Sequence, residues 1–388
     1  MGLLRAARER SLFTIAVDRD PGAVAFPLAD KRALVSIEDE PAVDRLARAE
    51  EVDGLIAPGT DWPVGVAARI ADRLGLPHPI SPATAALATS KQRQREAFAT
   101  AGVPQPRLLE RPVPPCVIKA PDRQGQRGLA VVREAAELDA AIAGAVAASR
   151  GGGFLAEELV EGPEVTVVAV SVAGEFVPVA INDRLTADPP AFGVALAHAW
   201  PSQAACDAAT RSRVVAAARD AAAAVGVREG PTYIQLRLGP DGPRVIELAA
   251  RLGGGHDAEL VELATGVRLN DLALEFALRG TASVAATQSP TGPVGTAESA
   301  PAGTGVGGAC VLFLRPPEGE LLAVEGVQDA LAVEGVADVH VYRAPGHVFG
   351  PFRLGSDRAG AILATGASRD DALERATRAA AAIRFVVG

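Results

Sequence analysis

Short hydrophobic runs alternate with helix-like segments over the first 80 residues. The apolar runs 13–18 and 53–58 predict buried strands, whereas the spacing of apolar residues in 41–51 and 64–74 predicts helices. Strands that alternate with helices are typical of a parallel sheet. A helix-like segment over 2–10 precedes the first run. We therefore expect either that the natural start lies upstream or that this sheet lacks its usual first strand.

The middle of the chain, residues 81–280, carries a longer series of such signals. Ser81 followed by Pro82 is typical of a helix N-terminus and predicts a helix over 81–101. The proline-rich residues 111–115 then interrupt the pattern. Beyond them the pattern predicts strands over 116–119, 129–133, 154–159 and 165–172, helices over 135–148 and 207–225, and a hairpin of strands 232–238 and 244–248.

An unusual segment separates the last part of the chain from the middle. Residues 281–308 are rich in Ala, Gly, Pro, Ser and Thr and carry a single charge, at Glu298, which predicts a linker or a long surface excursion. Further strands are predicted over 309–314, 320–324, 337–342 and 361–364, and a closing helix over 368–385 with Ser368 as its N-cap. We expect an N-terminal unit over 1–80, a central unit over 81–280 with a lid at about 113–158, and a small α+β unit over 309–388.

Composition narrows the class of protein. The chain has 388 residues of which 48% are hydrophobic, enough for more than one buried core. No run of about 18 or more uncharged apolar residues occurs, residues 1–10 lack a signal-peptide layout, and Cys116, Cys206 and Cys310 form no paired motif. The formal charge of −9 argues against nucleic acid as the main partner. These features predict a soluble cytoplasmic protein with no membrane or nucleic-acid partner.

The use of basic residues draws attention to single lysines. Of 38 basic residues only three are lysines, Lys31, Lys91 and Lys119. Such a bias turns generic surface cations into arginine, so a lysine that persists can serve a role that needs a compact ammonium group, such as a narrow phosphate slot. Chance survival is the alternative for any one of them.

The first candidate motif is PCVIKAPDRQGQRGL over 115–129. A buried strand ends in Lys119, and a flexible turn from Gly125 to Gly128 follows. Small residues let backbone N–H groups approach phosphate oxygens while the lysine supplies the countercharge. An ordinary hairpin between two strands would leave the same pattern.

The second motif is FLAEELVEGPEVTVV over 154–168. An apolar strand runs into Glu157 and Glu158, and Glu164 begins the next strand. Carboxylates beside such a hinge can accept hydrogen bonds from an adenine amino group and from ribose hydroxyls. A solvated acidic hairpin is the alternative.

The third motif lies over 233–256, YIQLRLGPDGPRVIELAARLGGGH. Gln235 and Glu247 fall on paired strands and can converge on one cation with oxygen ligands, which suits Mg²⁺. Arg251 and the glycines 253–255 follow, and together they suit a phosphoryl group in transfer. Glu247 could instead be an edge-strand carboxylate, but it lies inside an apolar run, where a carboxylate needs a partner.

In this order and spacing the three motifs, with the Ser90-Lys91 pair in the preceding helix, resemble the ATP-grasp superfamily. The resemblance covers about residues 80–280, and residues 1–80 are similar to the domain that precedes this fold in the family, without its first strand. It implies an α/β and α+β protein with an ATP-grasp fold, an N-terminal parallel α/β domain and a small C-terminal α+β domain. It also implies ATP and Mg²⁺ as cofactors.

The resemblance assigns roles residue by residue. Lys91 and Lys119 would hold ATP phosphates, and Gly125, Gln126, Arg127 and Gly128 would close over them. Glu157 and the backbone of Glu158 and Leu159 would meet the adenine, Glu164 the ribose, and Gln235 and Glu247 the magnesium. The family's usual asparagine is replaced by Ala249, which places a second magnesium in doubt.

The trailing glycines after Arg251 and the third unit resemble the L-amino-acid ligase branch. The implied reaction forms an acyl phosphate from a carboxylic acid and ATP, and an amine then displaces phosphate to give an amide or peptide bond. Arg251 and Lys119 would be catalytic. The expected partners are a small carboxylic acid and an amine, one of them an amino acid, and a homodimer is expected by analogy.

Substrate contacts are predicted for Arg184, Arg251, Gly254, Gly255, His256 and Asp257, and a weaker signal marks His198 and Trp200. Each side chain has a structural alternative, such as a helix cap for His256 or a first-turn position for Asp257. Two other functions stay open: carboxylation through carboxyphosphate, and a nucleotide-binding regulator without catalysis.

Overall fold

The computed structural model describes residues 1–287 and 306–388. The N-terminal elements are α1 (Gly2–Glu9), β1 (Ile15–Asp18), β2 (Lys31–Leu34), α2 (Glu40–Ala49) and α3 (Asp61–Leu74). Strands β1 and β2 pair in parallel, as the α/β pattern predicts, although the pattern did not reveal β2. The helices predicted over 2–10, 41–51 and 64–74 are confirmed within one to three residues at each end.

The strand predicted over 53–58 is wrong. The segment is extended but pairs with no strand. A Cβ atom on Gly54 would come within 2.4 Å of the carbonyl oxygen of Ala277 in α9 (Leu269–Arg279), so this backbone packs against a helix instead of a neighbouring strand. The N-terminal sheet is therefore limited to two strands in the described residues.

The single helix predicted over 81–101 is two helices, α4 (Pro82–Ala88) and α5 (Lys91–Ala101). Ser81 caps α4 as predicted, by accepting a hydrogen bond from the backbone N–H of Thr84. The break arises because the Ser90 side chain accepts from the N–H of Arg93 and so begins a second helix. Lys91 consequently occupies the first position of α5.

A small antiparallel sheet follows, in the order β4-β3-β5. Its strands are β3 (Cys116–Lys119), β4 (Leu129–Val132) and β5 (Leu155–Glu158), and α6 (Leu138–Ala148) covers it. Cys116, Ile118 and Val132 form its buried core with residues of α6. These strands confirm the predicted pattern almost residue for residue.

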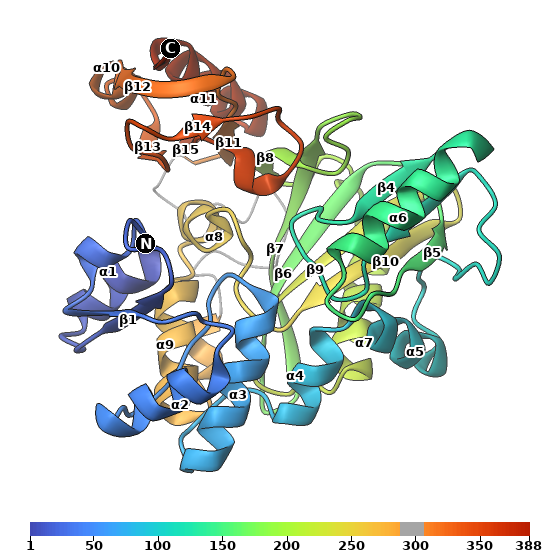
Figure 1. Cartoon of the computed structure of the whole chain (residues 1–388), viewed down its shortest axis with the longest axis horizontal. Helices are drawn as coiled ribbons and strands as arrows, with labels where there is room; N and C mark the ends of the chain where they lie inside the picture. Colours follow the sequence, from blue (N-terminus) through green and yellow to red (C-terminus); the bar gives the residue numbers. More distant parts are fainter. Residues whose placement is uncertain (288–305) are drawn as a thin grey trace.

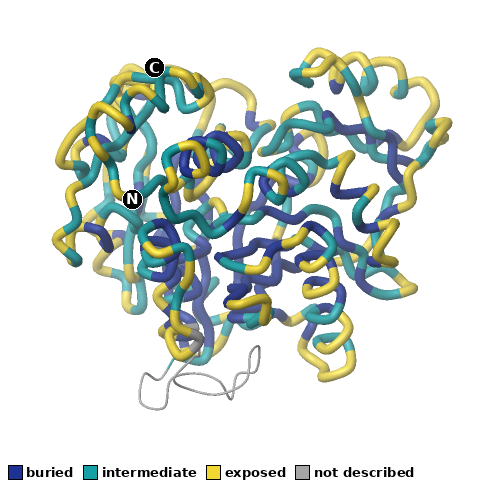
Figure 2. The backbone as a smooth tube through the Cα atoms, turned by 90° about the horizontal axis from the view of Figure 1, so that it is seen from below, coloured by how far each residue is buried: buried dark blue, intermediate teal, exposed yellow. Residues whose placement is uncertain are grey.

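The large sheet has eight strands in the order β10-β9-β6-β7-β8-β11-β15-β13 (Figure 1). Its strands are β6 (Glu164–Val172), β7 (Glu175–Thr186), β8 (Ala195–Trp200), β9 (Gly230–Gly239), β10 (Gly242–Ala249), β11 (Gly308–Leu314), β13 (Val336–Val341) and β15 (Gly360–Gly366). Helix α7 (Ala208–Ala224) packs on one face, and α8 (Asp257–Thr265) and α9 on the other. Alternate residues of β6 serve the two cores, with Val167 in the first and Val168 in the second. Figure 2 shows the buried backbone concentrated in this central layer.

The C-terminal segment does not build its own separate large sheet. Strands β11, β15 and β13 extend the central sheet, because β11 pairs with β8 as well as with β15. A three-stranded sheet of β12 (Gly319–Glu325), β14 (Val348–Phe349) and β16 (Arg384–Val387) lies beside α10 (Val327–Leu331) and α11 (Arg369–Ala382). The domain boundaries stay a prediction, and most of the predicted linker, residues 288–305, lies outside the described residues.

The closing helix begins as predicted but ends early. Ser368 caps α11 by accepting from the N–H of Asp371. The helix stops at Ala382, because the hydrophobic residues that follow pair with β12 as strand β16. No helix in the described ranges is long and apolar enough to cross a membrane.

Candidate active site

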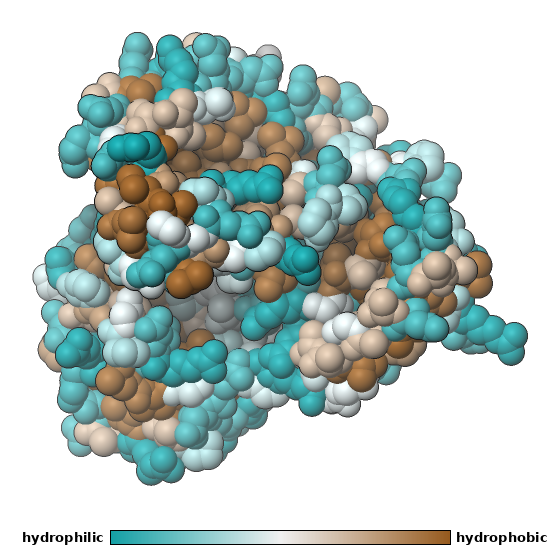
Figure 3. All heavy atoms as spheres, turned by 45° about the horizontal axis from the view of Figure 1, so that its top comes forward, coloured by the Kyte–Doolittle hydropathy of each residue, from teal (hydrophilic) through white to brown (hydrophobic). Residues whose placement is uncertain are grey.

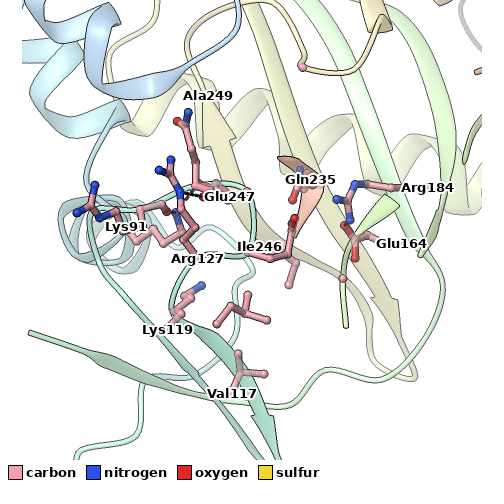
Figure 4. Close-up of a pocket in the computed structure, with 18 of the residues that line it drawn as sticks. Lys91, Val117, Lys119, Arg127, Glu164, Arg184, Gln235, Ile246, Glu247 and Ala249 are labelled. Atoms are coloured by element: carbon pink, nitrogen blue, oxygen red, sulfur yellow. Dashed lines mark hydrogen bonds and ion pairs between the residues drawn. The ribbon is translucent and has the colours of Figure 1, made fainter. Parts of the chain in front are cut away.

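A cavity of about 300 Å³ lies between the small sheet, the large sheet and the N-terminal part of the chain. The space-filling surface is hollowed near its centre in Figure 3, and Figure 4 shows the cavity with its lining side chains. Most of the predicted site residues line it: Lys91, Lys119, Gly125, Gln126, Arg127, Glu157, Glu158, Leu159, Glu164, Arg184, Gln235, Glu247, Arg251, Gly254 and Gly255. The fold thus brings together residues from all three sequence motifs.

Lys119 and Glu157 form a buried cluster with Arg95. Oxygen atoms of Glu157 lie 2.7 Å from Lys119 Nζ and 2.7 Å from Arg95 Nε, and all three side chains are at most 4% exposed. Burial opposes the charge on Glu157, but Lys119 and Arg95 outweigh burial and hold the pKa of this carboxyl at about 2. Glu157, predicted to meet adenine, has its carboxylate occupied by these two cations.

Strand pairing brings the predicted magnesium ligands together. Gln235 in β9 lies directly opposite Glu247 in β10, so both side chains project from the same face of the hairpin. The Oε1 atom of Glu247 lies 2.6 Å from Lys91 Nζ, which also donates to the backbone oxygen of Arg123. Burial opposes ionisation of Glu247, yet Lys91 keeps its pKa below the usual value. A carboxylate beside an amide oxygen offers hard oxygen ligands for one Mg²⁺ ion.

Ala249 limits what this hairpin can hold. The residue lines the cavity, but its methyl group offers no ligand. No group of three or more His, Cys, Asp or Glu side chains in the described residues is arranged to hold a metal. The residues present therefore fit one magnesium whose remaining ligands come from water and phosphate, and they do not supply a second site.

Glu164 is held by two arginines. Its carboxylate lies 2.7 Å from Arg184 Nη1 and 3.2 Å from Arg237 Nη2. Arg184 lies on the adjacent strand β7, and Figure 4 shows this pair at one side of the cavity. The predicted ribose contact and the predicted substrate contact are therefore paired with each other.

The predicted phosphate loop crosses the cavity between β3 and β4. Gly125 and Gln126 both have positive φ, at 67° and 64°. The Gln126 side chain lies near Gly193 and Gly355. A Cβ atom on Gly193 would lie 3.9 Å from Cγ of Gln126, and one on Gly355 would lie 3.5 Å from its Oε1. The loop thus spans from the small sheet to elements of the large sheet.

Gly128, the fourth predicted loop residue, lies outside the cavity lining. Its φ is 69°, and a Cβ atom there would lie 2.7 Å from the Cβ of Ala148 and 3.0 Å from that of Ala120. Glycine is needed at this position for packing of the loop against α6.

Arg251 is anchored by a residue that the sequence did not reveal. Its Nε and Nη2 atoms lie 2.6 and 2.5 Å from Oδ1 of Asp61, the first residue of α3. The backbone N–H of Asp61 donates to Gln124 in the phosphate loop, at 2.6 Å. Asp61 therefore links the N-terminal unit, the loop and Arg251.

Two predicted substrate residues, His256 and Asp257, do not line the cavity, so the direct contact predicted for them is not seen. His256 stacks on His340 with ring centroids 4.2 Å apart, and its Nε2 atom lies 2.8 Å from the Tyr342 hydroxyl. Asp257 is fully buried beneath His198. Substrate contact by His256 and Asp257 stays a prediction.

Several cavity residues were missed by sequence reasoning. Asp61, Tyr233, Arg237 and Arg358 line the cavity, and Arg95 lies behind it with its guanidinium on Glu157. Helix α5 gives one signal for Arg95, since an arginine follows Lys91 by one helical turn. Arg358 stacks on Phe313 at 3.8 Å from a loop far along the chain, and no local pattern marks it.

Comparisons with known proteins show what this chain is similar to. The family model "Carbamoyl-phosphate synthase L chain, ATP binding domain" matches residues 105–282, and "L-amino acid ligase C-terminal domain 2" matches residues 312–388. A formate-dependent phosphoribosylglycinamide formyltransferase of Burkholderia thailandensis is 30% identical over 408 residues, covering 96% of this chain and 89% of that protein. An uncharacterized protein of Sinorhizobium fredii, y4rH, is 27% identical over 394 residues, covering 95% of this chain and 77% of that protein.

The fold is also similar to that of solved structures. An L-amino acid ligase from Bacillus licheniformis superposes with a TM-score of 0.83 at 21% sequence identity, and the match covers 100% of this chain and 95% of that chain.

Proposed function

Because this chain belongs to the ATP-grasp superfamily, we propose that it is a ligase that uses ATP to join a carboxylic acid to an amine, one of them an amino acid. The observation that carries the proposal is that Lys91, Lys119 and Arg251 line the same cavity as the Gln235–Glu247 pair. The match of residues 312–388 to an L-amino acid ligase domain supports the amino acid as a substrate.

The two parts of the cavity suit the two parts of ATP. Val117, Leu159 and Ile246 give apolar surface beside the end of β5, where an adenine ring can lie against them. Backbone groups of Glu158 and Leu159 would meet the edge of the ring. The triphosphate would extend toward Lys91 and Lys119, which supply positive charge, under the loop of Gly125, Gln126 and Arg127.

Magnesium would be held by Glu247 and the amide oxygen of Gln235, with Lys91 beside them. When bound, it would offset negative charge on the phosphates. Since Ala249 offers no ligand, we propose a site for one ion.

In the first step a carboxylate oxygen of the acid would attack the γ-phosphorus of ATP, forming an acyl phosphate and releasing ADP. Lys119 and Arg251 would stabilise the charge on the transferring group. In the second step the amine nitrogen would attack the acyl carbon. The C–N bond forms, the C–O bond to phosphate breaks, and Arg251 would stabilise the oxyanion of the tetrahedral intermediate. The phosphate loop would exclude water, which otherwise hydrolyses acyl phosphates.

The test is phosphate release measured across a matrix of acids and amines, with the mass of each product. We expect release that requires both an acid and an amino acid, and a product mass equal to their sum minus water. Release that depends on bicarbonate alone would instead favour carboxylation. Release with formate and an amine would indicate an activity like that in the name of the Burkholderia relative. Tight ATP binding without release for any pair would favour the regulator and contradict the proposal. The cytoplasmic location and the homodimer stay predictions.

We expect the affinity for ATP to fall as pH rises above about 8, by up to about tenfold per pH unit. Burial lowers the pKa of Lys119 to about 8, with Arg95 and Lys91 adding to the effect and Glu157 opposing it. Above that pH the free protein holds a neutral Lys119, so binding the phosphates must first take up a proton. Calorimetric titration with ATP from pH 7 to 9.5 measures the change. The Lys119→Arg variant stays charged throughout, so an identical pH profile in the two proteins would contradict the role of Lys119.

We expect Glu247→Gln to raise the Mg²⁺ concentration needed for half-maximal ATP turnover. Loss of even an outer-shell partner costs about 10–100-fold in metal affinity, and a direct ligand should cost at least as much. The matched variant Gln235→Glu adds a carboxylate on the opposite strand and should lower that concentration. The measurement is ATP turnover as a function of Mg²⁺ concentration for the wild-type protein, Glu247→Gln and Gln235→Glu. A magnesium dependence unchanged in both variants would place the ion elsewhere.

A further inference from the structure

A histidine and an aspartate form a buried pair in the wall of the cavity. Nδ1 of His198, in β8, lies 2.8 Å from Oδ1 of Asp257, the first residue of α8. The side chains are 3% and 0% exposed. An ionised Asp257 accepts a hydrogen bond from Nδ1–H and so leaves Nε2 of His198 as an acceptor.

The imidazole ring is fixed by its surroundings. It meets the ring of Phe313 edge-on, with centroids 5.4 Å apart and an interplanar angle of 84°. The glycine run that precedes α8 makes this packing possible. A Cβ atom on Gly253 would lie 2.7 Å from the Cβ of Asp257, and one on Gly255 would lie 2.7 Å from Cζ of Phe313. Any other residue at these two positions would displace the pair or the aromatic ring beneath it.

The second nitrogen of His198 has no partner. Nε2 is buried and makes no hydrogen bond with any described residue, although His198 lines the cavity. A buried acceptor without a partner is costly, so such an atom at a cavity wall indicates a ligand that donates to it.

The other candidate bases in the cavity are already engaged. Among the described lining residues every carboxylate has a cation partner within 4.0 Å, and His198 is the one imidazole. Asp61 pairs with Arg251, Glu158 with Arg107, and Glu247 with Lys91. Two carboxylates have two partners each: Glu157 pairs with Lys119 and Arg95, and Glu164 pairs with Arg184 and Arg237. In this set His198 alone has a basic atom without a partner.

The charge around His198 suits deprotonation of an amine. Arg184 lies opposite His198 on the paired strand β7, but Glu164 balances its charge. Arg358 stacks on the same Phe313 ring, lines the cavity and has no carboxylate partner among the described residues. A nearby guanidinium that forms no ion pair disfavours the charged form of an ammonium group and so eases the loss of its proton.

We propose that His198 is the general base that removes a proton from the ammonium group of the amine substrate, and that Asp257 is the residue that positions it. The inference rests on the proposed ligase function. An ammonium ion has no lone pair with which to attack, so the second step needs a base in the cavity.

The step balances in protons and electrons. His198 Nε2 takes one proton from R–NH₃⁺, and the freed lone pair forms the C–N bond to the acyl carbon. The C–O bond to phosphate breaks and its electron pair leaves on the phosphate oxygen. The second proton of the nitrogen passes to that leaving phosphate, and His198 later returns its proton to water.

Hydroxylamine provides the test, because it is largely unprotonated at neutral pH and needs no base. We expect His198→Gln to slow amide formation with the amino acid by at least about 100-fold. Hydroxamate formation from the same acid and ATP should stay close to that of the wild-type protein. The ratio of the two rates is the readout, since a general loss of structure would lower both. Equal losses with both nucleophiles would overturn the proposal.

Two further variants make the result decisive. Asp257→Asn should lower the same ratio in the same direction, which covers the case in which His198→Gln does not fold. The matched control is His340→Gln, a buried histidine that lies 3.3 Å from Asp338 outside the cavity, and it should leave the ratio unchanged. A ratio that falls equally in the control would also overturn the proposal. If the wild-type protein forms neither amide nor hydroxamate with any acid, the proposed function fails and not merely the base.

Discussion

Replacing Glu157 with alanine is expected to lower the free energy of unfolding by about 3–5 kcal/mol. The substitution leaves the ammonium of Lys119 and the guanidinium of Arg95 buried without a counter-charge. Arg95 keeps its hydrogen bonds to the backbone oxygens of Val245 and Ile246, so its charge cannot move out to solvent without breaking contacts with β10. The loss should therefore reach beyond the site to the packing of α5 on the large sheet.

Chemical denaturation followed by circular dichroism measures this effect. Glu161→Ala is the matched control, because the side chain of Glu161 is 70% exposed and that of its partner Arg133 is 59% exposed. An exposed pair of this kind contributes at most about 1 kcal/mol. A loss in Glu157→Ala no larger than in the control would show that the buried cluster adds little to stability.

The same cluster sets a pH dependence. The pKa of Glu157 is about 2 in the folded protein against an ordinary value of 4.5. Its contribution is therefore complete above pH 4.5 and is lost as pH falls toward 2. We expect the stability difference between the wild-type protein and Glu157→Gln to shrink over that range.

The second large effect is expected for Arg251→Ala, which should lower kcat for ligation by about 10²–10³-fold. The guanidinium faces the cavity beside Glu247 and would stabilise charge that develops only during reaction. The Kd for ATP should change little, because Lys91 and Lys119 hold the phosphates in the proposed complex. Steady-state rates and calorimetric binding on one preparation separate the two quantities.

Two further variants test why kcat falls in Arg251→Ala. Arg251→Lys keeps a positive charge but cannot make both contacts to Asp61, so it should recover only part of the rate. Asp61→Asn keeps Arg251 but weakens its anchor, and it should lower kcat less than Arg251→Ala. An unchanged kcat in Arg251→Ala would remove Arg251 from the proposed mechanism.

Local patterns were sufficient wherever a few neighbouring residues decide the structure. The strand that ends at Lys119 and the caps at Ser81 and Ser368 were predicted at the positions observed. The β9–β10 hairpin shows the limit of such local prediction. Its two-residue turn fixes the register near the loop, which would place Ile246 opposite Gln235; a β-bulge between Val245 and Glu247 shifts the pairing by one residue and brings Glu247 opposite Gln235. The sequence thus predicted the paired strands, but the bulge that aligns these two side chains appeared only in the structure.

Contacts between segments distant in the sequence could not be predicted from local patterns. The strand predicted over 53–58 failed because its backbone meets α9 at Gly54 and its apolar residues pack against helices without a pairing strand, and periodicity does not distinguish the two cases. His198 and Asp257 were both noted as candidates near the substrate. Only the structure places one at the cavity wall and the other beneath it.

The sequence by itself determined the local elements, the three motifs and their kinship with ATP-grasp proteins, because these depend on short-range spacing. The tertiary structure decided which charges meet: Arg251 with Asp61, 190 residues apart, and Lys91 with Glu247, 156 residues apart. Such pairs arise when sheets and helices pack, and burial then makes an unpaired carboxylate in the cavity costly. The unpaired nitrogen of His198 stands out only against that background.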